Sequence, residues 1–371
     1  MSRLLVAFDT RLSPRPSGVG IYTRDLLAAL AARPELQVVA VASPQQPLPE
    51  GVERLATEIA FDAHGPAEYF EHVALPRQLA ARKVELLHGP NTIVPAGRTP
   101  FARVVTIHDV AFARYGQTLT PAFRMLMRTR TRASLALADA AVAVSSFTAD
   151  ELRALYPRLA TRVIALPSGT PEGALRHVRD PNRATARARE LGLEPGRFLC
   201  AIGTLEPRKN LPTLLQAFAQ AAIPGVKLAL IGDRGWREGP LREALSRMPS
   251  DSVVLTGWLD TEQVYDLIAS SAGLAYPSLY EGFGFPPLEA LALGVNVACA
   301  DLPPIRESCD GQVRLIGPLD LPGWVEALRW LVSSGPRPPW VGRRFSDVAS
   351  ELVEVYRVAV EGWSSRRKAS R

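Results

Sequence analysis

The chain has 371 residues, 47% of them hydrophobic and 22% charged, which is typical of a globular protein long enough for two domains. Its three cysteines form no CxxC pair, which argues against a disulfide framework or a structural zinc site. The net charge of +6 fits anionic lipid, a diphosphate or nucleic acid without choosing among them. Because the N-terminus lacks a signal-peptide pattern and no apolar run is long enough to span a bilayer, we expect a cytoplasmic location.

The first half of the chain alternates between short apolar runs and helical patterns. The runs that predict strands are residues 4–8, 37–42, 84–88, 103–107, 140–144 and 162–166. This alternation predicts a mostly parallel sheet covered by helices on both faces, with ligands bound at the carboxyl ends of the strands. The segment 170–182, which contains Pro, Gly and charged residues, is predicted to be a linker, so we expect a domain boundary there.

A glycine pair follows the first predicted strand. Gly18 and Gly20 are expected to lie immediately before a helix that runs from about Ile21 to Ala32. Backbone N–H groups without side chains around them can meet a phosphate or a sugar hydroxyl at this position. A lone GxG also fits a plain turn, so the motif is weak by itself.

Two histidines stand at predicted strand ends. His108 can donate to a phosphate or to a sugar hydroxyl, and Asp109 is expected to hold its ring. His88 ends the preceding strand in the same way, and we interpret it as a satisfied structural residue. Further along, Arg124 and Arg128 belong to a basic, partly apolar helical pattern that fits either an anionic membrane surface or a solvated arginine face.

The second half begins with a strand near Phe198, a glycine turn, and two cations. Arg208 and Lys209 precede a helix expected to open near Leu211, where cations and helix N–H groups suit a diphosphate. Cations placed there would stabilise the negative charge that develops on a departing diphosphate. Strands are also predicted at 227–231 and 253–256.

The segment 273–294 reads GLAYPSLYEGFGFPPLEALALG, and we regard it as the main ligand-binding feature. A buried strand at 273–276 is followed by turn residues and by a helix with two prolines in its first turn, which Gly294 ends. Gly282 and Gly284 permit close approach of the backbone to a phosphate. Glu281 and Glu289 frame this loop, and a carboxylate can accept hydrogen bonds from vicinal sugar hydroxyls.

The run YEGFGFPPLEA resembles the donor-binding signature of the retaining, nucleotide-sugar-dependent glycosyltransferases called group 1 or family 4. GTLEPRKN at 203–210 resembles a motif of mannosyltransferase-like members, with Thr204 where many relatives carry arginine, and TIHD and GVGIY also match family segments. The site residues that the resemblance implies are His108, Arg208, Lys209 and Glu281 for catalysis, and Gly18, Gly20, Gly282, Phe283, Gly284 and Glu289 for donor binding.

The resemblance implies a GT-B fold, an α/β architecture of two Rossmann-like domains that face a central cleft and close over the substrates. Residues 1–170 would form the acceptor-side domain and residues 171–344 the donor-binding domain. A C-terminal helix at about 345–363 would cross back to the first domain, and its apolar spacing includes Val348, Leu352 and Val358. The final RRKASR is expected to be disordered.

The function predicted is transfer of a hexose, with mannose favoured, from GDP-mannose or a UDP-hexose to a glycan or lipid-linked acceptor in polysaccharide biosynthesis. We expect no cofactor and no metal, because no DxD pair stands at a strand end. The alternatives are a nucleotide-sugar epimerase or hydrolase of the same fold, and a non-catalytic sugar-nucleotide sensor. Nucleic-acid binding ranks last, since no nucleic-acid motif accompanies the arginines.

Overall fold

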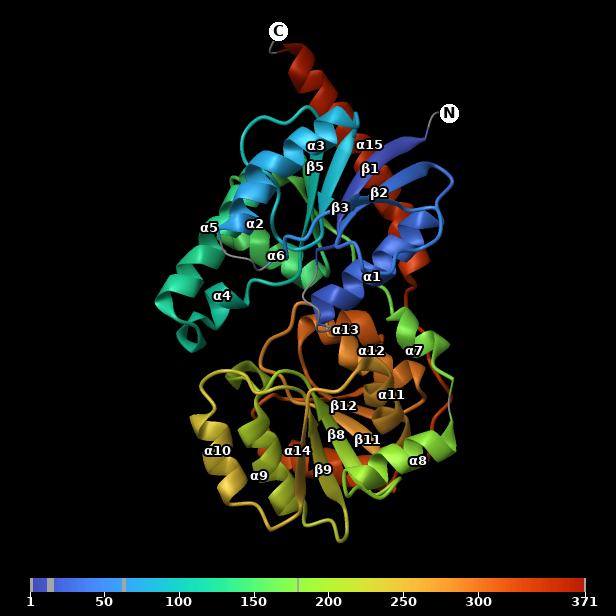
Figure 1. Cartoon of the computed structure of the whole chain (residues 1–371). Helices are drawn as coiled ribbons and strands as arrows, with labels where there is room; N and C mark the ends of the chain where they lie inside the picture. The colour runs from blue at the N-terminus through green and yellow to red at the C-terminus, as the bar shows by residue number, and fades with distance from the viewer. Residues whose placement is uncertain (1–2, 12–16, 62–64, 179, 370–371) are drawn as a thin grey trace. The chain divides into compact units, whose positions relative to one another are not determined.

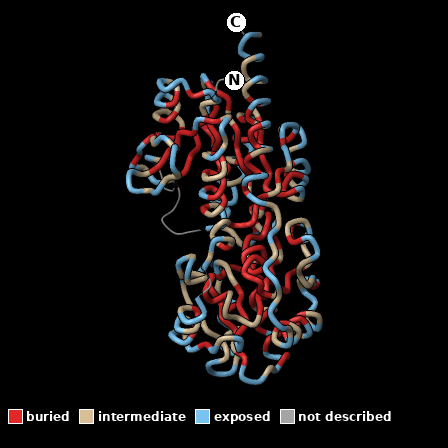
Figure 2. Tube along the Cα trace, turned by 90° about the vertical axis from the view of Figure 1, so that its right-hand side faces the viewer, coloured by how far each residue is buried: buried red, intermediate tan, exposed pale blue. Residues whose placement is uncertain are grey.

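The computed structural model of the chain describes residues 3–11, 17–61, 65–178 and 180–369. It contains two compact units, one formed by residues 1–169 together with 343–371 and the other by residues 170–342. Each unit is a parallel sheet with helices on both sides (Figure 1). In each unit the buried residues gather in the interior and the exposed residues lie on the outside (Figure 2).

The first unit has a sheet of seven strands among the described residues, in the order β3-β2-β1-β4-β5-β6-β7, with every neighbouring pair parallel. The strands are β1 (Leu4–Asp9), β2 (Leu36–Ala42), β3 (Glu53–Ala56), β4 (Leu86–Gly89), β5 (Ala102–Ile107), β6 (Ala140–Ala143) and β7 (Val163–Ala165). The helices are α1 (Gly18–Ala31), α2 (Pro66–Tyr69), η1 (Phe70–Ala74), α3 (Leu75–Ala81), α4 (Ala111–Arg114), η2 (Gly116–Thr118), α5 (Pro121–Leu137), α6 (Ser146–Leu155), η3 (Ala160–Arg162) and α15 (Phe345–Ala369).

The second unit has a sheet of six strands in its described part, in the order β10-β9-β8-β11-β12-β13, again with parallel neighbours. The strands are β8 (Phe198–Ile202), β9 (Lys227–Ile231), β10 (Val253–Gly257), β11 (Gly273–Tyr276), β12 (Val297–Ala300) and β13 (Arg314–Ile316). The helices are α7 (Glu172–Arg176), α8 (Pro181–Glu190), η4 (Pro207–Lys209), α9 (Leu211–Ala221), α10 (Gly239–Ser246), α11 (Thr261–Ser270), α12 (Phe285–Ala292), α13 (Pro303–Cys309) and α14 (Leu321–Ser333).

Both sheets confirm the predicted α/β class, and the central strands fall where the apolar runs predicted them. β9 and β11 have the predicted bounds. The sequence analysis missed β3 and β13, each of which is one of the two edge strands of its sheet. β3 reads ERLA and β13 reads RLI, so neither presents the apolar run that a strand buried on both faces requires.

In each sheet the strand order reverses at one point. This switch lies between β1 and β4 in the first unit and between β8 and β11 in the second. The loops that leave two such neighbouring strands diverge to opposite faces, and the space between them is the usual ligand site of an open parallel sheet. The second switch is therefore flanked by the loops 203–210 and 277–284.

The C-terminal helix α15 returns to the first unit, where it packs on α1 and β5. It buries Val348, Leu352 and Tyr356, whereas Val358, which the apolar spacing included, is 66% exposed and does not face the core. The helix also continues to Ala369, which corrects the expectation of disorder for residues 366–369; residues 370 and 371 lie outside the described residues.

Buried hydrogen bonds among Tyr356, His88 and Thr106 anchor α15 to the sheet. Tyr356 Oη lies 2.6 Å from His88 Nδ1, and His88 Nε2 lies 2.8 Å from Thr106 Oγ1. Burial, with a smaller effect of His108, lowers the pKa of His88 to about 3, so the ring is neutral. Both nitrogens have protein partners, which confirms that His88 is a satisfied structural residue.

We expect Tyr356→Phe to destabilise the protein by about 1–3 kcal/mol, because a buried histidine nitrogen would lose its partner. Urea unfolding gives the change in free energy. The matched control is Tyr156→Phe, which removes a partly exposed hydroxyl bonded to the Arg128 carbonyl at 3.3 Å and should cost less than about 0.5 kcal/mol. Equal midpoints for the two variants would contradict the anchoring role.

Candidate functional site

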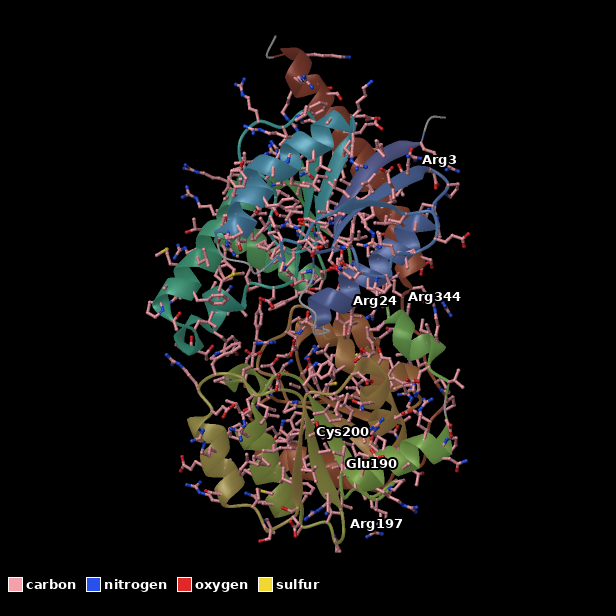
Figure 3. The ribbon with its side chains drawn as sticks, viewed as in Figure 1. Arg3, Arg24, Glu190, Arg197, Cys200 and Arg344 are labelled. Carbon is pink, nitrogen blue, oxygen red and sulfur yellow. The ribbon has the colours of Figure 1, made fainter. Side chains whose placement is uncertain are left out.

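Two loops that are far apart in the sequence meet at the switch point of the second sheet. β8 and β11 pair directly, with Gly273 opposite Leu199. In Figure 3, Arg197 marks the amino-terminal end of β8 and Cys200 its middle, so the loop with Arg208 and Lys209 leaves from the opposite end. The Leu279 N–H donates to the Arg208 carbonyl at 2.8 Å, which joins the two loops through their backbones.

A single carboxylate holds both predicted phosphate-binding cations. Glu281 Oε1 lies 2.7 Å from Lys209 Nζ, and Glu281 Oε2 lies 2.9 Å from Arg208 Nη1. Arg208 Nη2 also contacts Glu206 Oε1 at 2.5 Å. Glu281 and Lys209 are 7% and 8% exposed, so the ion pairs are largely removed from water. The structure thus brings together three of the predicted catalytic residues, with the cations side by side.

Tyr276, at the end of β11, completes this cluster, and the sequence analysis assigned it no role. Lys209 Nζ donates to Tyr276 Oη at 2.9 Å, and that hydroxyl donates to Glu281 Oε1 at 2.8 Å. The ammonium also lies 4.8 Å from the centroid of the tyrosine ring, within the range of a cation–π interaction. The sequence does contain one signal for this role, because Tyr276 ends a buried strand just before the glycine-rich loop.

The charges of the cluster decide its protonation. Burial alone would raise the pKa of Glu281, but Arg208 and Lys209 outweigh burial and lower it to about 2. Burial lowers the pKa of Lys209, and Glu281 offsets part of that effect. Burial and Glu281 together raise the pKa of Tyr276 well above its ordinary value, so the phenol keeps its proton. At neutral pH the carboxylate is therefore ionised.

Glycines allow the Lys209 side chain to lie against the end of β8. Gly203 has φ +137°, and a Cβ added there would stand 2.7 Å from Lys209 Cε. Gly232, after β9, has φ +145°, and its added Cβ would stand 2.3 Å from the Gly203 carbonyl oxygen. Side chains at either position would collide with the loop, which explains why two neighbouring strands both end in glycine.

Asn210 fixes the end of the cation loop, and the sequence analysis missed this role. Its backbone is left-handed, with φ 54° and ψ 30°, as asparagine tolerates. Its Nδ2 donates to the carbonyls of Pro277 at 3.2 Å and Pro318 at 2.8 Å, and its Oδ1 accepts from Thr213 Oγ1 at 2.7 Å. These bonds tie the start of α9 to the loops that follow β11 and β13.

The predicted glycine loop after β11 has the expected form. Gly284 caps α12 with φ +100°, and an added Cβ would stand 2.4 Å from Ile305 Cδ1. Gly282 lies in the same loop, between the buried Glu281 and Phe283, and the Phe283 ring meets Phe285 edge-on with centroids 5.2 Å apart. Glu289 is 4% exposed on α12, and its Oε1 accepts from the Tyr265 hydroxyl at 3.1 Å.

In the first unit, His108 stands at the carboxyl end of β5. Its Nε2 lies 2.7 Å from the Pro90 carbonyl oxygen, so Nε2 carries the proton. Burial lowers the pKa of His108, the ring is therefore neutral, and its Nδ1 is an acceptor. The Pro90 carbonyl therefore holds the His108 ring, which is the role that was predicted for Asp109. Asp109 Oδ1 instead accepts a hydrogen bond from the Ala111 N–H at 2.9 Å.

The predicted placement of the glycine pair is corrected by the structure. Gly18 and Gly20 lie inside the first turn of α1, not before it, because Ser17 is the N-cap. The Gly20 N–H donates to Ser17 Oγ at 3.1 Å. The Gly20 N–H, which was expected to meet a phosphate or a sugar hydroxyl, is therefore already bonded to the helix cap. The proline-containing segment before it, residues 12–16, lies outside the described residues.

The described residues contain neither a metal-binding cluster nor a membrane-spanning helix. Within residues 3–11, 17–61, 65–178 and 180–369, no group of three or more His, Cys, Asp or Glu side chains is arranged to hold a metal ion. In that same part of the chain, no helix combines the length and the apolar character that crossing a bilayer requires.

The sequence matches two family descriptions in consecutive segments. Residues 16–172 match Glycosyltransferase Family 4, and residues 182–337 match Glycosyl transferases group 1. Together the two matches span most of the chain. The protein therefore belongs to the group 1, family 4 glycosyltransferases, as the loop motifs predicted.

Curated relatives include mannosyltransferases. The chain is 29% identical over 226 residues to O-antigen chain mannosyltransferase B of Escherichia coli, which covers 60% of this chain and 58% of that protein. It is 27% identical over 237 residues to the serotype-specific mannosyltransferase WbdA of Escherichia coli, which covers 62% of this chain and 29% of that protein. The matches thus span under two thirds of these relatives' lengths.

Solved structures share the fold over nearly the whole chain. Sucrose-phosphate synthase from Thermosynechococcus elongatus aligns with a TM-score of 0.66 at 20% identity, covering 99% of both chains. WaaG, a glycosyltransferase involved in lipopolysaccharide biosynthesis, aligns with a TM-score of 0.64 at 18% identity, and the alignment covers 96% of this chain and 98% of the WaaG chain. These likenesses confirm the predicted GT-B fold of two Rossmann-like units.

Because the pKa of Glu281 is depressed from 4.5 to about 2, its ion pairs contribute stability above pH 4.5 that is lost as the pH falls toward 2. At about 1.4 kcal/mol per pKa unit, this contribution is about 3 kcal/mol. Urea unfolding of Glu281→Gln and wild type should therefore differ strongly at pH 7 and converge between pH 5 and pH 2. Glu243→Gln, in an exposed pair with Arg247 on α10, is the control and should follow the wild type throughout. A constant gap for Glu281→Gln would contradict the assignment.

Proposed function

We propose that this protein is a metal-independent hexosyltransferase that moves a hexose, most favourably mannose, from a nucleoside diphosphate sugar to a glycan or lipid-linked acceptor in polysaccharide biosynthesis. The observation that carries the proposal is the pairing of Lys209 and Arg208 on Glu281 at the switch point of the second sheet. Family membership and the mannosyltransferase relatives support the same reading.

The cations would act on the leaving group. When the bond between the hexose and the diphosphate breaks, negative charge grows on the diphosphate oxygens, and cations preorganised beside them lower the barrier. Glu281 holds Lys209 and Arg208 side by side in a buried setting. Glu281 would thus contribute by holding these cations in place, in addition to the hydroxyl contact implied by the family.

The remaining predicted residues would hold the sugar and the nucleotide. Glu289, near the start of α12, would accept hydrogen bonds from the ribose hydroxyls, and Gly282 and Gly284 would let the backbone approach the phosphates. His108 presents an acceptor nitrogen, so it would accept a hydrogen bond from a sugar hydroxyl and would not donate to a phosphate. Retention of the anomeric configuration is what the family implies.

The donor is proposed to be GDP-mannose, with a UDP-hexose as the other candidate. The mannosyltransferase relatives favour mannose, and a solved relative of the fold, HepE from Anabaena, was crystallised with UDP. Calorimetry with both nucleotide sugars therefore decides the donor and tests the site at the same time.

We expect wild type to bind one of these donors, and both Lys209→Ala and Glu289→Ala to bind it about 10- to 100-fold more weakly, since each loses charge-assisted hydrogen bonds. The matched controls are Lys227→Ala, at the amino-terminal end of β9, and Glu243→Ala, exposed on α10; both should bind like wild type. Absence of binding by every donor would overturn the donor site, whereas donor hydrolysis or epimerisation without transfer to any acceptor would favour the alternative enzymes.

Contact with an anionic membrane is proposed for α5. This helix has four arginines and no acidic residue, and its first half exposes Phe123, Met125 and Leu126 by 49%, 62% and 37%. Exposed apolar side chains beside arginines suit the interface of an anionic bilayer, where lipid-linked acceptors reside. Arg130 is paired with Glu68, so the remaining arginines of the helix would supply most of the attraction.

Cosedimentation should show binding to phosphatidylglycerol vesicles and little binding to phosphatidylcholine vesicles, with binding reduced by added salt. The double variant Phe123→Ser/Met125→Ser should lose about 10-fold or more of this affinity, because it removes the side chains that would insert. Arg242→Gln/Arg247→Gln, which removes two exposed arginines from α10, is the charge control. If the α5 and α10 variants lose affinity equally, α5 is not the docking surface.

A further inference from the structure

Tyr265, on α11, contacts the carboxylate proposed to bind the ribose. Its hydroxyl donates to Glu289 Oε1 at 3.1 Å, and the two residues are 3% and 4% exposed. Hydrogen bonds to an ionised acceptor are among the stronger ones in proteins, and a bond to one oxygen restricts the rotation of the carboxylate. Glu289 is therefore oriented by the protein before any ligand arrives.

Tyr265 is itself braced by the segment at the start of the second unit. A Cβ added to Gly173 in α7 would stand 3.1 Å from the Tyr265 hydroxyl, and the His177 ring meets the Tyr265 ring edge-on with centroids 5.6 Å apart. The next residue, Asp266, fixes the same segment: His177 Nε2 lies 3.1 Å from it, and Arg183 donates to both its oxygens at 2.8 and 3.0 Å.

These contacts leave the hydroxyl little freedom. The ring is covered on the side of α7, and its oxygen is bonded on the side of α12. An enzyme that must recognise ribose hydroxyls needs an acceptor whose direction is fixed, since a mobile carboxylate would have to be ordered when the ligand binds. The contacts of Tyr265 fix the direction of the Glu289 carboxylate in advance.

We infer that Tyr265 is a positioning residue that orients Glu289 toward the ribose hydroxyls of the donor and so sets the preference for ribonucleotides. The inference rests on the proposed function of this site. Tyr265 acts through Glu289 and does not itself touch the nucleotide. Its removal should therefore weaken only that part of binding which depends on the ribose hydroxyls.

The test is calorimetric binding of GDP and UDP, and of their 2′-deoxy and 3′-deoxy counterparts, to wild type and Tyr265→Phe. Wild type should bind the ribonucleotide about 10-fold or more tightly than the deoxynucleotide, because the deoxynucleotide lacks a hydroxyl that donates to the ionic acceptor Glu289. Tyr265→Phe should weaken the binding of the ribonucleotide by about 5- to 10-fold and leave the binding of the deoxynucleotide nearly unchanged. In turnover, the donor KM should rise by the same factor with kcat nearly unchanged, since the contact is equal in the ground and transition states.

Three controls make the result specific. Tyr156→Phe, in the first unit, should keep the wild-type ratio of ribonucleotide to deoxynucleotide affinity. In a Glu289→Gln background, Tyr265→Phe should add little, because coupled residues are not additive. If Tyr265→Phe does not fold, Gly173→Ala, which would displace the same ring, replaces it and should also lower the ratio.

The outcomes separate the two claims. If wild type binds no nucleotide, the proposed function fails and this inference fails with it. If wild type binds and prefers ribonucleotides but Tyr265→Phe keeps that preference, the proposed function stands and the positioning role is overturned. Equal weakening of ribonucleotide and deoxynucleotide would also overturn it, because it would show a general structural effect.

Discussion

The second unit depends on one buried carboxylate shared by two cations. Lys209 and Arg208 are neighbours in the sequence, and two positive charges held this close in a site of low dielectric would repel each other without an anion between them. Glu281 lies 72 residues beyond Lys209 in the chain and contacts both cations, one with each oxygen. Burial opposes its ionisation, but the two ion pairs prevail and keep its pKa near 2. The two loops therefore hold a pair of cations side by side, which is the arrangement proposed to stabilise a departing diphosphate.

The backbone around this carboxylate explains how the loops hold their shape. Gly203 and Gly232 accept positive φ values where any side chain would strike Lys209 or the neighbouring loop. Asn210 takes a left-handed conformation and uses its amide to bind the carbonyls of Pro277 and Pro318. Tyr276 bonds to both members of the Lys209–Glu281 pair. These residues lie at or beside the carboxyl ends of β8, β9 and β11, so the strand order of the sheet determines the geometry of the site.

The first unit shows how similar residues can have different roles. His88 and His108 both stand at the ends of predicted strands, and both are neutral because burial lowers their pKa values. His88 has both ring nitrogens bonded inside the protein, to Tyr356 and Thr106, and serves the packing of α15. His108 is held through Nε2 by a backbone carbonyl, which defines Nδ1 as an acceptor. The difference lies in which partners the fold supplies, and the sequence pattern around each histidine does not contain it.

The sequence by itself determined the α/β class, the central strands, the proline-started helix α12 and the residues of the two loops at the second switch point. It could do so because strands buried on both faces need continuous apolar runs, and glycine and proline mark turns and helix starts through their own backbone limits. Short polar edge strands such as β3 lack that signal, and the first turn of α1 was missed because its glycines resemble a loop. Only the tertiary structure decided that Glu281 pairs with both Lys209 and Arg208, and that Tyr265 holds Glu289. Such contacts depend on which strands pair and which helices pack together, and a carboxylate or a tyrosine carries no local mark of the partner that folding brings to it.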